Sequence, residues 1–75
     1  PVAGMGTDES QRMIELLAGL KGDKTILLVE HDMDAVFALA DRISVLVYGR
    51  IIATGTPAEI RANAGVRAAY LGEDD

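Results

Sequence analysis

The stretch Thr25-Ile-Leu-Leu-Val-Glu-His-Asp-Met-Asp34 places the only histidine of the chain where an apolar run gives way to charged residues. The run from Thr25 to Val29 is rich in β-branched and aliphatic residues, which predicts a strand buried on both faces. In open α/β sheets, ligands bind beyond the carboxyl ends of such strands. We therefore expect His31 to lie at a sheet edge, where the ligand-binding and active sites of α/β proteins are found.

The residues on either side predict an α/β fold with a parallel βαβ unit. Apolar residues recur at helical spacing over residues 8–21, with Thr7 as the predicted N-cap. A second helix is predicted from Asp32, its N-cap, to about Ala40, and a second strand over residues 42–47. The roughly 12 residues between the two strands are about enough for the helical crossover that parallel pairing requires.

The remaining residues predict an antiparallel hairpin strand and C-terminal helices. Gly49 fits a tight turn with positive φ, so the strand over residues 50–54 is expected to run antiparallel to the one before it. Thr56 and Glu59 have the spacing of a capping box and predict a short helix. A last helical segment is predicted over residues 64–71.

Composition limits the class of protein. The chain has 75 residues, 49% of them apolar, no cysteine and a formal net charge of −5. This predicts one small folded domain, excludes disulfides and thiolate metal sites, and argues against binding of nucleic acid, which requires clustered basic residues. No apolar run approaches the roughly 20 residues that span a bilayer. Because the sequence opens with a Gly-rich stretch and no Met, we expect a segment of a larger domain.

Three interpretations of His31 stay open on the residues alone. It is a general base or polarising donor at a sheet edge, a loop residue without a role, or a metal ligand, although no second His or Cys completes a metal shell. A small hydrolase with His31 as base lacks a convincing nucleophile, because Ser10 and Ser44 fall in a predicted helix and strand. The stretch from Gly4 to Gly6 lacks the spacing of a phosphate-binding loop.

Three segments together resemble the C-terminal part of ATP-binding cassette (ABC) transporter ATPases, a P-loop-type fold. They are the stretch quoted above, Ala40-Asp-Arg-Ile-Ser-Val-Leu, and Gly49-Arg-Ile-Ile-Ala-Thr-Gly-Thr-Pro-Ala-Glu-Ile. The resemblance implies that His31 is the switch, or H-loop, histidine, which contacts the γ-phosphate of ATP and the attacking water. It also implies a D-loop at a dimer interface, formed by Ala3, Gly4, Met5 and Gly6, although Gly6 stands where many relatives have Asp.

The D-loop sequence and the ending Val66-Arg-Ala-Ala-Tyr-Leu-Gly are similar to the ATPases of branched-chain amino acid transporters. The resemblance implies a single partial domain over residues 1–75. Within it, residues 1–7 are the D-loop region, residues 8–62 the C-terminal part of the ATPase core, and residues 63–75 a C-terminal extension. The phosphate-binding loop, the signature motif and the acidic residues that hold Mg²⁺ are not among these 75 residues. We therefore expect no activity and no cofactor for the segment alone.

The resemblance implies the C-terminal part of the ATP-binding subunit of an importer that couples ATP hydrolysis to transport of branched-chain amino acids. The intact subunit would bind ATP and Mg²⁺ and pair with a second ATP-binding subunit. Permease subunits would hold it at the cytoplasmic face of the membrane, without direct insertion. The alternative is a stand-alone, non-catalytic interaction or dimerisation module. The predicted strands have few helices to cover them, which favours self-association of the segment.

Overall fold

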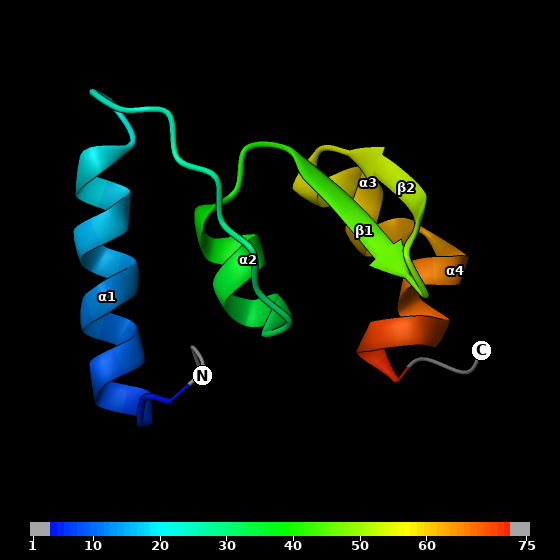
Figure 1. Cartoon of the computed structure of the whole chain (residues 1–75), viewed down its shortest axis with the longest axis horizontal. Helices are drawn as coiled ribbons and strands as arrows, with labels where there is room; N and C mark the ends of the chain where they lie inside the picture. Colours follow the sequence, from blue (N-terminus) through cyan, green and yellow to red (C-terminus); the bar gives the residue numbers. More distant parts are fainter. Residues whose placement is uncertain (1–3, 73–75) are drawn as a thin grey trace. The chain divides into compact units, whose positions relative to one another are not determined.

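The computed structural model describes residues 4–72, which form a mixture of helices and strands (Figure 1). In chain order the elements are α1 (Thr7–Leu20), α2 (Met33–Leu39), β1 (Ile43–Val47), β2 (Arg50–Gly55), α3 (Pro57–Ala62), α4 (Ala64–Val66) and the π-helical segment η1 (Arg67–Leu71). The chain divides into two compact units, with the boundary between Leu39 and Ala40.

Helix α1 opens the first unit and confirms the predicted helix to within one residue at each end. Asp8 and Glu9 occupy its first turn, where acidic side chains suit the positive end of the helix dipole. The prediction that Thr7 caps this helix was wrong. Gly6 is the N-cap, with extended backbone and no side-chain cap, so Thr7 already lies inside the helix.

Helices α1 and α2 contact each other within the first unit (Figure 1). On α2 the side chains of Ala35, Val36 and Leu39 are buried. The apolar stripe of α1 is covered less well, since Leu17 is half-buried and Leu16 is 59% exposed. One short neighbouring helix covers only part of an apolar face that extends over 14 residues.

The parallel βαβ unit that the sequence predicts is not shown by the structure. Residues 25–30 adopt no regular secondary structure, and within the described residues β1 pairs with β2 alone. Leu27 is 91% exposed and Val29 is 89% exposed, whereas the prediction placed both in a buried strand. A strand requires a paired neighbouring strand, and the segment has none within the described residues, so it does not become part of a sheet.

The second unit begins with the antiparallel hairpin of β1 and β2, as predicted. Val47 pairs with Arg50, which leaves Tyr48 and Gly49 as a two-residue loop. Both loop residues have positive φ, 50° at Tyr48 and 75° at Gly49, as tight hairpin turns of the primed type require. Further along, the pairing skips Ile52, which forms a β-bulge in β2.

Helices α3 and α4 both contact β2 and give the second unit a core of its own. Side chains alternate along β1, so that Ile43 and Val45 are buried while Ser44, between them, is exposed and hydrogen-bonds Thr54 across the hairpin. The helices add Ile60 and Val66, both almost completely buried. Burial of such an aliphatic side chain contributes about 1.5–3 kcal/mol, so four of them are the main stabilising contacts of this unit.

The capping box predicted at the start of α3 is confirmed. The Thr56 hydroxyl accepts the Glu59 N–H at 3.2 Å, and the Glu59 carboxylate accepts the Thr56 N–H at 2.8 Å. Gly55 leaves room for this arrangement, because a Cβ atom at that position would lie 2.6 Å from Glu59 Oε1. The hairpin therefore passes into the helix through one residue without a side chain and a reciprocal pair of hydrogen bonds.

The capping box also has an electrostatic consequence. Hydrogen bonds from the backbone and side chain of Thr56, with the nearby positive charge of Arg42, hold the pKa of Glu59 below its ordinary value. A carboxyl whose pKa is lowered by folding stabilises the folded state fully above its unfolded pKa, and this contribution is lost as the pH falls through the folded pKa.

We expect α3 to loosen in acid as Glu59 takes up a proton. The side-chain carbonyl shift of Glu59 should titrate below the ordinary glutamate pKa, and exchange of the Thr56 amide proton should accelerate over the same pH range. Both are measured by NMR on the same samples. Glu59→Gln is the matched control, because glutamine also serves in a capping box but does not titrate. An equal acid dependence in that variant would contradict the assignment.

Candidate functional site

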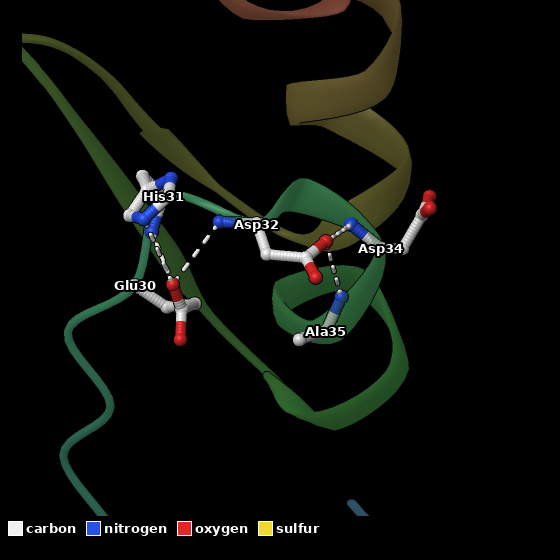
Figure 2. A network of polar contacts seen from close by, with 5 residues as sticks. All are labelled: Glu30, His31, Asp32, Asp34 and Ala35. Carbon is white, nitrogen blue, oxygen red and sulfur yellow. Dashed lines mark hydrogen bonds and ion pairs between the residues drawn. The ribbon is translucent and has the colours of Figure 1, made fainter. Parts of the chain in front are cut away.

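The turn that carries His31 connects the extended residues 25–30 to α2 and is held by two carboxylates (Figure 2). Oε1 of Glu30 accepts the N–H of His31 at 2.9 Å and the N–H of Asp32 at 3.3 Å. The carboxylate of a residue at the end of the extended segment thus reaches forward to the next two backbone groups. These two bonds fix the direction in which the chain leaves that segment.

The second carboxylate, that of Asp32, begins α2. Its Oδ1 accepts the N–H of Asp34 at 3.0 Å and the N–H of Ala35 at 3.4 Å, and its carbonyl oxygen accepts the N–H of Val36. These are the bonds of an N-cap, which satisfy donors that the first turn of a helix leaves without partners. The prediction that Asp32 caps this helix is confirmed.

The imidazole of His31 lies beside the Glu30 carboxylate, and the His31 side chain is 81% exposed (Figure 2). Its Nε2 atom lies 3.7 Å from Oε1 of Glu30, whose side chain is only 5% exposed. A single buried oxygen therefore lies near two backbone N–H groups and the ring. The exposed ring can donate or accept a hydrogen bond, and the buried carboxylate accepts two backbone N–H groups of the turn.

The sequence interpretation missed Glu30. The signal that could have drawn attention to it is a carboxylate at the end of an apolar run, directly before the histidine. An acidic residue there is buried only when donors surround it, because burial of an uncompensated charge is costly.

The residues predicted to form the D-loop directly precede α1 in the chain. Ala3 falls outside the described residues. Gly4 has a positive φ of 76°, Met5 is half-buried, and Gly6 is the N-cap of α1. No hydrogen bond between described residues joins Gly4, Met5 or Gly6 to His31.

A phosphate at this turn could bind the imidazole of His31, but the turn presents no set of unoccupied backbone N–H groups to it. The N–H groups of His31, Asp32, Asp34 and Ala35 already donate to carboxylates within the turn. Phosphate-binding loops instead present successive unoccupied N–H groups to the anion. In residues 4–72, no three His, Cys, Asp or Glu side chains are placed to hold a metal ion.

Comparison with known proteins shows what the chain is related to. A family model described as branched-chain amino acid ATP-binding cassette transporter matches residues 50–75. Over 97% of its length, the chain is 48% identical to the high-affinity branched-chain amino acid transport ATP-binding protein LivG of Salmonella typhimurium and 47% identical to that of Escherichia coli. It is 43% identical, over the same share, to the corresponding protein BraF of Pseudomonas aeruginosa.

These similarities confirm the resemblance found in the sequence: the chain is homologous to the ATP-binding proteins of ABC transporters. The relatives that it matches over nearly all its length are those of branched-chain amino acid transport. The chain spans 29% of the length of LivG and of BraF. No solved structure matches it. None of the helices in the described part of the chain has both the length and the apolar character that crossing a membrane requires.

We expect Asp32→Ala to destabilise the first turn of α2, because the N–H groups of Asp34 and Ala35 lose their acceptor. Amide hydrogen exchange at Asp34 and Ala35, followed by NMR, should become several-fold faster, while exchange within α1 stays unchanged. Asp32→Ser is the matched control, since serine retains a capping oxygen and should keep most of the protection. Unchanged exchange in Asp32→Ala would contradict the cap.

Proposed function

We propose that this chain is the C-terminal part of the ATP-binding subunit of an ABC importer that couples ATP hydrolysis to uptake of branched-chain amino acids. The observation that carries the proposal is the similarity to LivG over 97% of the chain, at 48% identity. The family model over residues 50–75 points to the same transporter group independently of the turn at His31.

In this proposal His31 is the switch histidine of the intact subunit. An exposed imidazole on a turn held by two carboxylates suits a group that must meet a ligand in a fixed position. ATP and Mg²⁺ would be bound by parts of the subunit outside residues 4–72, and the bound nucleotide would supply the phosphoryl group that is transferred to water. His31 would donate a hydrogen bond to a γ-phosphate oxygen and orient the attacking water.

The domain layout and partners of the proposal follow from the same resemblance. Residues 1–7, with Ala3, Gly4, Met5 and Gly6, would meet a second ATP-binding subunit as the D-loop region, residues 8–62 would complete the ATPase core, and residues 63–75 would be a C-terminal extension. In the intact subunit residues 25–29 would join a parallel sheet as the first strand of a βαβ unit. The exposure of Leu27 and Val29 supports this, because burial of these apolar side chains against neighbouring elements would stabilise the fold. Permease subunits would hold the assembly at the cytoplasmic face of the membrane.

Replacing His31 with Ala in the full-length subunit should reduce the rate of ATP hydrolysis by about a hundredfold or more, because a positioned polar group contributes on that order to the transition state. Steady-state hydrolysis by the assembled transporter provides kcat, and nucleotide titration provides the ATP affinity, which should change far less.

Asp23→Asn, in the exposed turn after α1, is the matched control for this experiment and should leave the rate unchanged. Hydrolysis at the wild-type rate in the His31→Ala variant would refute the switch role.

A second candidate is that the segment acts by itself as a non-catalytic interaction or dimerisation module. The observation in its favour is the apolar surface that the described residues leave exposed, on the extended segment at Leu27 and Val29 and on the hairpin at Leu46 and Ile51. Single exposed apolar residues are ordinary, but several close together along one backbone segment favour association.

If the second candidate holds, the isolated 75-residue chain should sediment as a dimer or larger species at about 100 µM, and Leu27→Lys together with Val29→Lys should shift it to monomer. Sedimentation velocity over a tenfold range of concentration measures both. Lys24→Glu, at an exposed site near the segment, is the control for a general effect of charge. A compact monomer at every concentration would rule out the module.

A further inference from the structure

We propose that Glu30 is a positioning residue for His31: its carboxylate holds the backbone on which the imidazole is presented to the nucleotide. This inference rests on the proposed function of His31 and adds to it a residue that does not itself touch the reacting atoms. The contacts that carry it all lie within the turn of Figure 2.

Three contacts converge on one oxygen atom. Oε1 of Glu30 accepts the N–H of His31 at 2.9 Å and the N–H of Asp32 at 3.3 Å, and lies 3.7 Å from Nε2 of His31. The two backbone groups flank the Cα atom of His31, since one belongs to His31 itself and the other to the next residue. A carboxylate bound to both restricts rotation of the backbone at the residue whose ring is presented.

Glu30 and His31 differ in exposure, and this difference indicates different roles for the two side chains. Glu30 is 5% exposed and His31 is 81% exposed, although they are neighbours. A carboxylate is buried beside backbone N–H groups when those hydrogen bonds replace its lost hydration. The exposed imidazole is accessible to a ligand, while the buried carboxylate stabilises the turn through its hydrogen bonds.

Asp32 cannot supply this support in place of Glu30. Its carboxylate is directed to the N–H groups of Asp34 and Ala35, one turn further along. Without Glu30, the N–H groups of His31 and Asp32 would have no acceptor within the turn, and the ring would sample more positions. Misplacement of a catalytic group by about 1 Å can reduce a rate by up to a hundredfold, so loss of this acceptor should act on kcat.

The test is a double-mutant cycle on the full-length subunit, assembled in its transporter. Glu30→Ala, Glu30→Asp and Glu30→Gln are each made with His31 present and with His31→Ala, and kcat and KM for ATP hydrolysis are measured for all of them. Thermal unfolding of each variant provides the stability. Glu30→Asp retracts the carboxylate by one methylene, and therefore tests the contact even if Glu30→Ala fails to fold.

With His31 present, we expect Glu30→Ala and Glu30→Asp to lower kcat by about tenfold with KM changed less than about twofold. Glu30→Gln should stay close to the wild-type rate, because its amide oxygen can accept both N–H groups. With His31→Ala, the same Glu30 substitutions should cause little further loss, because a residue that acts through His31 has no effect without it.

Several results would overturn the inference. Equal fold losses with and without His31 would show that Glu30 acts on the fold alone. Loss in Glu30→Gln as large as in Glu30→Ala would show that acceptance of the two N–H groups is not what matters. No loss in Glu30→Ala would remove the role altogether. Wild-type hydrolysis in His31→Ala would instead refute the proposed function of His31. The two failures are therefore distinguished by whether the unchanged kcat belongs to the Glu30 variants or to the His31 variant.

Discussion

Hydrogen bonds from four backbone N–H groups between His31 and Ala35 to two carboxylates determine the structure around the candidate site. The chain must pass from an extended segment into α2 within the residues from Glu30 to Ala35, and the change of direction would leave backbone N–H groups without partners. Glu30 accepts the first two and Asp32 accepts two of the next. Because both acceptors are supplied within the turn, α2 can begin at Met33 while the side chain of His31 stays exposed.

Most local features could be predicted from the sequence, because they are set by residues within four positions of each other. The capping box of Thr56 and Glu59 and the two-residue turn of the hairpin, with the positive φ of Gly49, are of this kind. The strand predicted over residues 25–29 depends on a neighbour that the apolar pattern cannot supply. Periodicity shows that a segment is suited to burial, but pairing decides whether it becomes a strand.

The candidate site was predicted unevenly for a related reason. His31 could be singled out because it follows an apolar run, and Asp32 because an aspartate before a helical pattern is a common N-cap. Glu30 was missed, although it stands directly before the histidine, because its role depends on a side chain that reaches forward to the two following N–H groups and becomes buried there. The D-loop role of the residues from Gly4 to Gly6 was inferred from resemblance, and the structure adds only their backbone conformation.

Each of the two units of the chain is stabilised by contacts of its own. The second unit forms a core from Ile43, Val45, Ile60 and Val66, and the family model lies within that unit. The first unit contains His31 and buries Ala35, Val36 and Leu39 of α2, and both units leave some apolar side chains exposed. The turn at His31 is held by hydrogen bonds within a few residues. Such a turn keeps its geometry when its neighbours move, which suits a group that must meet a ligand bound by other parts of a larger protein.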